Sequence, residues 1–209
     1  MASQAKALLL AGEASGDLYG SVLAKELKRR FPEYQLMAFG GQKMKEAGVE
    51  LRCNLVDEAV IGVYEALARL PRYYSIWKEL KSLLAEEKPS PVILIDYPGF
   101  NVRAARYAQS LKLDTIYYIP PKVWAWKQRR TKVLAEVSKL IVTIFPFEPP
   151  LYEKCNGKAV YCGHPLVDLV PCKIDSAAEP RKKQVAIVPG SRIQEIDRML
   201  PRFLDCAKL

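Results

Sequence analysis

The sequence predicts an α/β fold with a Rossmann-like, mostly parallel sheet. Two observations support this prediction: short apolar runs alternate with longer amphipathic segments, and several of the runs end in a loop that contains glycine. This alternation is typical of βα units in a parallel sheet. With 209 residues, 50% of them hydrophobic, the chain is long enough for one well-buried domain and part of another.

The first apolar run, 6–11, is the first expected strand, and the amphipathic segment 17–30 is the first expected helix. Proline residues punctuate several helix ends, because proline cannot continue a helix from within. The other strands are expected at 35–39, 91–96, 114–119, 139–144 and 158–161. The other helices are expected at 42–47, 58–69, 72–87, 100–111, 127–137 and 148–155.

The pattern breaks in a polar, charged stretch that is typical of a linker. Beyond it, Gln184 to Val188 is expected to form a strand and Arg192 to Leu209 an amphipathic helix. One strand and one helix cannot bury their apolar faces alone, so we interpret them as the first βα unit of a truncated second domain. The expected organisation is a domain, a linker and that unit, at 1–170, 171–183 and 184–209.

Lysine and arginine outnumber aspartate and glutamate by 32 to 23, and the formal net charge of +9 favours anionic partners. The five cysteines contain no C-x-x-C pair, so neither a disulfide framework nor a zinc site is indicated, and a reducing cytoplasm is the simplest compartment. No apolar stretch approaches the length of a signal-peptide core or a membrane-spanning helix. Any membrane contact is therefore expected to be peripheral.

The apolar run at 93–96 ends in Asp96, which is followed by Pro98-Gly99. Ligands of open α/β sheets bind beyond the carboxyl ends of the strands, so Asp96 is in a suitable place to act as a general base. The alternative is that Asp96 only caps the helix that begins near Phe100. This segment alone does not decide between the two roles.

The loop after the first strand contains Gly12, Glu13, Ser15 and Gly16. Glycine allows the backbone to approach a ligand, and a helix N-terminus offers free N–H groups. The glycine spacing differs from the dinucleotide fingerprint, and Glu13 would repel a pyrophosphate. The alternative, a helix capped by Ser15 or Asp17, leaves Glu13 unexplained.

Residues 58–70 carry an apolar stripe beside cations and aromatic rings, which suits a helix at a lipid interface, although most stripes of this kind are core-facing helix surfaces. The stripe consists of Val60, Val63, Tyr64 and Leu67. A second aromatic and basic stretch includes Trp124, Trp126 and Arg129. It suits stacking on a ring and binding of phosphate, and it also suits single-stranded nucleic acid, although no nucleic-acid-binding motif is present.

Two further loops follow expected strands. His164, the only histidine, has no other metal ligands at suitable spacing, so we interpret it as a hydrogen-bonded hinge residue. Gly190, Ser191 and Arg192, with Glu195 one turn later, open the last helix. Their backbone amides and the guanidinium could hold a diphosphate, although ordinary helix capping is the alternative.

Seven segments together resemble the lipid-A-disaccharide synthases, inverting glycosyltransferases of the GT-B fold. They occur in the order of that family along almost the whole chain: AGEASGD, GGQKMKEAG, IDYPGFN, VWAWKQRR, FPFE, YCGHPLVD and PGSR. The resemblance implies the N-terminal, acceptor-side domain of an enzyme that joins UDP-2,3-diacylglucosamine to 2,3-diacylglucosamine 1-phosphate. It also implies that this chain is close to half of the family's length, so we expect little or no transferase activity from the chain alone.

The resemblance also assigns roles to residues. Asp96 matches the family's proposed base, with Glu13 as the alternative, and Arg192 matches a residue near the UDP diphosphate. Substrate contacts are expected from Gly12, Ser15, Gly16, Asn101, Trp124, Trp126 and Arg129, and UDP contacts from Gly190, Ser191, Arg192 and Glu195. Neither a metal nor another cofactor is expected, and neither is nucleic acid.

The expected location is the cytoplasmic face of the inner membrane, with the stripe at 58–70 toward acyl chains. The oligomeric state is open, a homodimer included. Two rival interpretations remain at this point: another GT-B-like protein, such as a sugar-nucleotide epimerase with a soluble substrate, and a non-catalytic module that binds anions or nucleic acid.

Overall fold

A computed structural model describes residues 5–58, 70–122, 129–170, 184–190 and 193–208. The chain divides into two compact units, Met1–Val170 and Pro171–Leu209, which are described separately. The expected stripe at 58–70 lies almost entirely outside the described residues, as do Trp124, Trp126, Ser191, Arg192 and the linker at 171–183.

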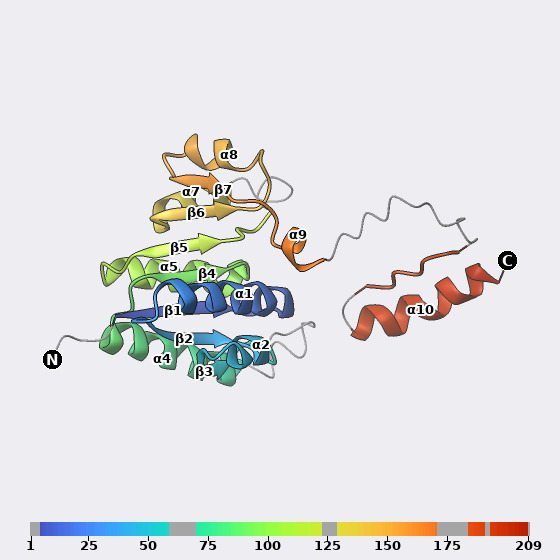
Figure 1. The fold of residues 1–209 in the computed structure, drawn as a ribbon, viewed down its shortest axis with the longest axis horizontal. Coiled ribbons are helices and arrows are strands. Elements are labelled where there is room, and N and C mark those ends of the chain that lie inside the picture. The colour runs from blue at the N-terminus through green and yellow to red at the C-terminus, as the bar shows by residue number, and fades with distance from the viewer. Residues whose placement is uncertain (1–4, 59–69, 123–128, 171–183, 191–192, 209) are drawn as a thin grey trace. The chain divides into compact units, whose positions relative to one another are not determined.

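The described part of the first unit is built on a seven-stranded, entirely parallel sheet with the strand order β3-β2-β1-β4-β5-β6-β7 (Figure 1). The central strands are apolar on both faces, as is typical of a parallel sheet covered on both sides. The strands are β1 (Lys6–Ala11), β2 (Gln35–Gly40), β3 (Glu50–Asn54), β4 (Val92–Ile95), β5 (Thr115–Tyr118), β6 (Leu140–Thr143) and β7 (Ala159–Tyr161).

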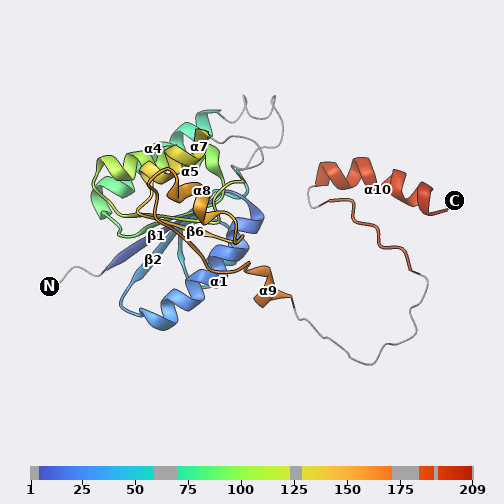
Figure 2. The same cartoon turned by 90° about the horizontal axis from the view of Figure 1, so that it is seen from above.

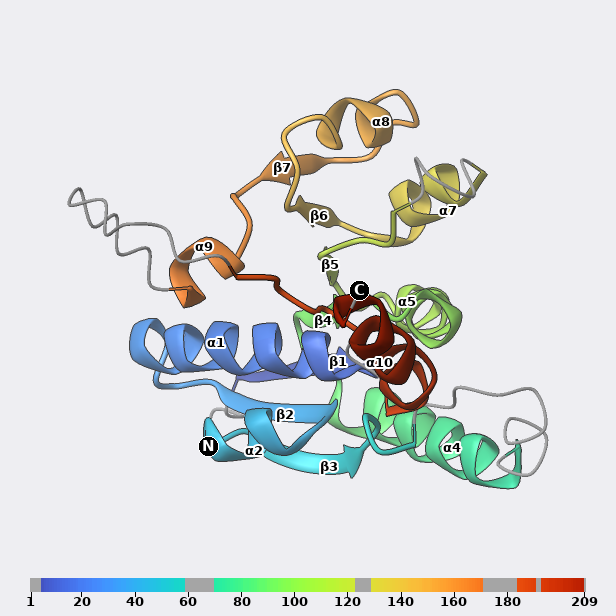
Figure 3. The same ribbon diagram turned by 90° about the vertical axis from the view of Figure 1, so that its right-hand side faces the viewer.

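Helices cover both faces of this sheet, as Figures 2 and 3 show. The helices in the described part of the first unit are α1 (Ala14–Arg30), α2 (Gln42–Glu46), α4 (Leu70–Glu87), α5 (Pro98–Ser110), α7 (Arg129–Val137), α8 (Pro149–Glu153) and α9 (Leu166–Leu169). One core cluster packs α4, α5 and α7 on one face, and another packs α1 and α2 on the other. The predicted Rossmann-like fold is therefore confirmed.

Asp17 performs a structural role in the loop that was compared with a phosphate-binding site. Its buried carboxylate accepts hydrogen bonds from the backbone N–H groups of Gly41, Lys43 and Met44, at 2.9, 2.9 and 3.1 Å. These groups belong to the N-terminus of α2, so Asp17 caps the neighbouring helix across the sheet edge. The alternative interpretation, in which Ser15 or Asp17 caps α1, is wrong, because Glu13 is the N-cap residue and makes no side-chain cap hydrogen bond.

Two elements differ from the sequence-based expectation. Strand β3 was not expected, because it lies at the edge of the sheet, only Cys53 of its residues is buried, and its apolar signal is weak. The strand expected at Gln184 to Val188 is absent from the described residues, where 184–190 has no regular structure. A strand needs a hydrogen-bonded neighbour, and the described part of the second unit contains no other strand.

The second unit contains the helix α10 (Ile193–Ala207), which begins close to the expected residue and includes Pro201. The loop before it has Gly190 at a φ of +116°. A side chain at this position would be strained, and its Cβ would lie 2.7 Å from the Glu195 carboxylate oxygen Oε2. Glycine therefore allows this loop to turn tightly against the first turn of α10.

Candidate active site

Glu13 and Asp96 follow two neighbouring strands at the point where the strand order reverses. Strands β1 and β4 pair in parallel, with Ala11 opposite Ile95, so the loops that follow them leave the sheet side by side. The chain continues from β1 into α1 on one face of the sheet and from β4 into α5 on the other (Figure 3). This reversal creates the crevice in which open α/β sheets bind ligands.

Asp96 and Tyr97 both have left-handed backbone conformations, with φ values of 45° and 46°. Residues other than glycine rarely adopt this conformation, and it costs roughly 1–3 kcal/mol for each residue. Two such residues in succession turn the chain sharply between β4 and α5. Strain of this kind persists only where surrounding contacts hold it, and it is concentrated at functional sites.

Two buried side chains hold this turn. The Asn101 Nδ2 amide donates hydrogen bonds to the backbone oxygens of Asp96, Ile95 and Leu10, at 2.8, 3.1 and 3.3 Å. The Tyr117 hydroxyl donates to the same Asp96 oxygen at 2.7 Å. The Asp96 peptide is therefore fixed from α5 and from β5, and its carboxylate is attached to a rigid backbone.

Asn101 is completely buried, and all of its amide hydrogen bonds go to the backbone. In this structure Asn101 is a positioning residue for Asp96, and its contact with substrate stays a prediction. Gly16 is buried as well. An added Cβ would lie 3.2 Å from the Ala11 Cβ, so glycine at this position allows α1 to pack closely on the sheet.

The carboxyl group of Asp96 is a weaker acid than an ordinary aspartate. Burial raises its pKa to about 6, and the negative charge of Glu13 raises it as well. A hydrogen bond from the backbone of Tyr97 and the positive charge of Lys122 act in the opposite direction. Burial combined with a like charge at a strand end is typical of catalytic carboxylates, so Asp96 is the strongest candidate for a general base.

Gly12 allows the Tyr97 ring to pack against the β1–α1 loop. A Cβ at Gly12 would lie 2.2 to 2.5 Å from three carbons of this ring. The Tyr97 hydroxyl in turn shares a hydrogen bond of 2.8 Å with the hydroxyl of Tyr73 in α4. Gly12 therefore has a steric role that connects the two loops of the crevice.

Gly12→Ala is expected to destabilise the first unit by about 1–3 kcal/mol, because the ring of Tyr97 must move away from its site. Urea unfolding measures the change. Gly99→Ala is the matched control, since an added Cβ at Gly99 has no atom within 4 Å, and it should leave stability unchanged or higher. Equal effects of the two substitutions would contradict the proposed packing role.

The other predicted residues of the first unit lie at the same edge of the sheet. Ser15 is exposed in the first turn of α1, and Arg129 is exposed at the start of α7. His164 is hydrogen-bonded, as predicted: its Nδ1 atom accepts the N–H of Leu166 at 3.2 Å. Gly190 and Glu195 belong to the second unit.

Sequence reasoning missed the role of Tyr117. Tyr117 lies inside an expected strand, where an apolar ring needs no functional explanation, and its hydrogen bond depends on the tertiary structure. The sequence signal that could have found it is a hydroxyl group on a residue that faces the interior of the sheet, because such a group needs a partner.

Comparison with known proteins shows the family to which the chain belongs. The family model described as lipid-A-disaccharide synthetase matches residues 7–209. The chain belongs to this family. Lipid-A-disaccharide synthases are glycosyltransferases of lipid A biosynthesis, and the described fold fits the N-terminal domain of a GT-B enzyme.

Several curated lipid-A-disaccharide synthases match the chain over nearly its whole length. The relative from Geobacter metallireducens is 40% identical over 211 residues, which cover 98% of this chain and 55% of the relative. The relative from Trichlorobacter lovleyi is 37% identical with the same coverage, and lipid-A-disaccharide synthase 1 from Legionella pneumophila (strain Paris) is 36% identical over 221 residues. The chain thus spans about half the length of these relatives.

None of the helices in the described part of the chain is long and apolar enough to cross a bilayer.

Proposed function

We propose that the protein acts in the transfer of 2,3-diacylglucosamine from UDP to 2,3-diacylglucosamine 1-phosphate, which yields lipid A disaccharide 1-phosphate and UDP. Family membership supports the reaction class. The observation that carries the catalytic assignment is the partly buried carboxyl group of Asp96, with a pKa of about 6, at the reversal point of the sheet. An acceptor hydroxyl needs a base of this kind beside it.

In the proposed mechanism, the Asp96 carboxylate takes the proton of the acceptor hydroxyl. The hydroxyl oxygen then forms its bond to the anomeric carbon of the donor from the face opposite UDP, the bond from that carbon to the UDP oxygen breaks, and the configuration inverts. A pKa near 6 leaves the group mostly ionised at neutral pH, yet makes it a stronger base than an ordinary aspartate. Asn101 and Tyr117 hold the Asp96 backbone, so the carboxylate needs little reorganisation.

Positive charge is proposed to assist the departure of UDP. The loop of Gly190, Ser191 and Arg192, with Glu195 in α10, is proposed to bind the diphosphate, and its tight turn at Gly190 supports this role. Ser15, Trp124, Trp126 and Arg129 remain proposed substrate contacts. The net charge of +9 supports a peripheral site on anionic lipid at the cytoplasmic face of the inner membrane.

The test is a transferase assay with both acylated substrates in detergent micelles. It compares the chain alone with a fusion to the part of the Geobacter metallireducens relative that this chain does not cover. We expect disaccharide and UDP from the fusion, and little or none from the chain alone. A folded fusion that forms no disaccharide from these substrates would contradict the proposal.

Glu13→Gln in the fusion is expected to move the acid limb of the kcat/KM profile to lower pH. Removing the negative charge of Glu13 lowers the pKa of Asp96, although burial keeps it above the ordinary value of 3.8. Glu33→Gln, an exposed substitution beyond the end of α1, is the control and should leave the limb in place. Complete loss of activity in Glu13→Gln, together with activity in an Asp96 variant, would make Glu13 the base.

A further inference from the structure

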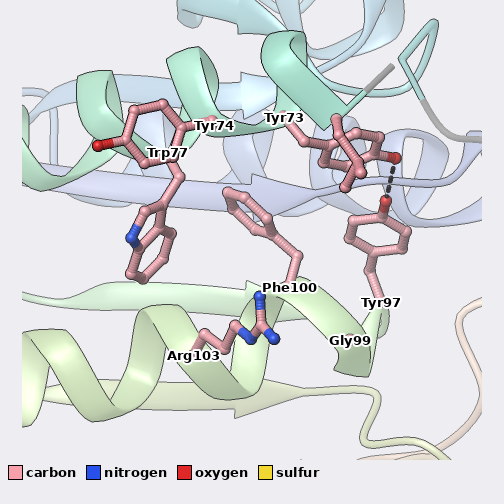
Figure 4. A pocket seen from close by; sticks show the side chains of 8 residues that line it. Tyr73, Tyr74, Trp77, Tyr97, Gly99, Phe100 and Arg103 are labelled. Carbon is pink, nitrogen blue, oxygen red and sulfur yellow. Dashed lines mark hydrogen bonds between the residues drawn. The ribbon is translucent and has the colours of Figure 1, made fainter. Parts of the chain in front are cut away.

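A groove lined by aromatic side chains lies between α4 and α5, beside the crevice described above. Its volume is about 430 Å³, which is within the range of small-molecule sites, roughly 300–1,000 Å³. Figure 4 shows the rings of the two helices facing one another across this space. The lining residues are Leu70, Tyr73, Tyr74, Trp77, Tyr97, Gly99, Phe100 and Arg103.

Ring contacts join the lining residues to one another and to α5 beyond the groove. Trp77 packs edge-on against Phe100 and Tyr107, with ring centroids 5.8 and 6.2 Å apart. The Lys81 ammonium lies 4.9 Å from the centroid of the Tyr107 ring. The lining is overwhelmingly apolar, and this favours an aliphatic chain over a sugar or a nucleotide, whose polar groups would lose their hydration there.

The other end of the groove is adjacent to the candidate base. Tyr97 lines the groove and directly follows Asp96 in the left-handed turn. Its ring packs on Gly12, and its hydroxyl is bonded to that of Tyr73 (Figure 4). The groove therefore borders the turn that contains the proposed base.

The groove also has a cation at its rim. Arg103 is exposed, and its guanidinium points toward the space between the two helices (Figure 4). No ion pair of Arg103 occurs among the described residues, in contrast to Arg72, which is paired with Glu58 at 3.0 Å. A guanidinium at the edge of an apolar groove complements a ligand with an aliphatic chain and an anionic head.

We propose that this groove binds an acyl chain of the diacylglucosamine 1-phosphate acceptor, with Arg103 close to its phosphate. The proposal rests on the proposed function, since it locates one substrate of that reaction. It commits to the substrate rather than to bulk membrane lipid, because Tyr97, which lines the groove, belongs to the same turn as Asp96. The chain would anchor the acceptor while its hydroxyl approaches the carboxylate.

Photochemical labelling of the 209-residue chain tests the proposal. The probe is 2,3-diacylglucosamine 1-phosphate with a diazirine in one acyl chain, and mass spectrometry locates the labelled peptides. We expect labels within α4 and α5 that an excess of unlabelled acceptor removes. Deacylated glucosamine 1-phosphate and phosphatidylglycerol at the same concentration should compete far less.

Gly99→Leu provides the decisive variant. An added Cβ at Gly99 meets no atom within 4 Å, so a leucine can occupy the groove without distorting the helix. Labelling of α4 and α5 should fall about tenfold or more, which corresponds to losing the burial of two CH₂ groups. Arg106→Leu introduces the same side chain at an exposed position of α5, and this variant should be labelled as strongly as the parent.

The role of Arg103 has its own pair of variants. Arg103→Gln should weaken acceptor binding about tenfold through loss of a charged hydrogen bond, whereas Arg106→Gln should change it less than about twofold. Urea unfolding verifies that each variant is folded. Equal effects of the two substitutions would remove the phosphate from the proposed binding mode.

Three results would overturn the proposed acyl-chain site: labels outside α4 and α5, undiminished labelling of Gly99→Leu, or equal competition by phosphatidylglycerol. The last would identify a general lipid site. The labelling needs no glycosyl transfer, so it is independent of the transferase assay. An active fusion with an unlabelled groove would refute only this inference, whereas a labelled groove with an inactive fusion would refute only the proposed reaction.

Discussion

Asp96→Asn is expected to lower kcat/KM of the fusion by about 10²–10⁴-fold, because an amide cannot accept the acceptor's proton. Asparagine has nearly the size of aspartate, so the backbone hydrogen bonds of Asn101 and Tyr117 to residue 96 should persist. The transferase assay measures the loss. Activity within a few-fold of the parent would remove Asp96 from the proton transfer.

The same substitution is expected to stabilise the fold near neutral pH. The pKa of Asp96 rises from 3.8 to about 6 on folding, so the folded chain binds more protons than the unfolded chain between these values. The parent therefore loses stability as pH rises from about 4 to about 6, by up to about 3 kcal/mol. The neutral amide avoids this loss.

Urea unfolding over a series of pH values measures the expected gain. Asp96→Asn should exceed the parent by about 1–3 kcal/mol above pH 6, and the difference should shrink toward pH 4. Asp197→Asn, at an exposed position of α10, is the control and should change stability little at any pH. A variant less stable than the parent at neutral pH would contradict the buried-charge explanation. Gain of stability with loss of activity is the pattern of a residue retained for function.

The sequence predicted the elements that bury apolar side chains on both faces. Strands β1 and β4 are continuous apolar runs, and the loops beyond them contain Glu13 and Asp96, so the crevice could be located from strand ends alone. Strand β3 has one exposed edge and a mixed pattern, and it was missed for that reason. The prediction of a strand at 184–188 was wrong, because a local sequence pattern does not show whether a neighbouring strand is present to pair with it.

The supporting contacts of the site could not be read from local pattern. Tyr117 in β5 and Asn101 in α5 both donate to the backbone oxygen of Asp96. They can do so only because the strand order places β4 between β1 and β5. The groove likewise requires α4 and α5 to pack side by side, which depends on connections through the whole sheet. Sequence reasoning therefore identified Asp96, named Asn101 as a substrate contact and not as a residue that holds the turn, and missed Tyr117.

Asn101→Asp is expected to destabilise the first unit by about 3–5 kcal/mol at neutral pH. The Asn101 amide is the donor to three backbone oxygens, on β1, on β4 and in the turn at Asp96. A carboxylate offers no donor, so three acceptors would lose a partner and face a buried negative charge. Protonation restores one donor, so part of the loss should be recovered as pH falls.

Urea unfolding again provides the measurement, with two comparisons. Asn156→Asp makes the same chemical change at an exposed position and should have little effect. Tyr117→Phe removes only one of the hydrogen bonds to the Asp96 oxygen and should cost less, about 1–3 kcal/mol. The exchanges Asp96→Asn and Asn101→Asp should thus change stability in opposite directions, although the residues lie five positions apart. An Asn101→Asp variant as stable as the parent at neutral pH would mean that the turn at Asp96 is not held by the Asn101 amide.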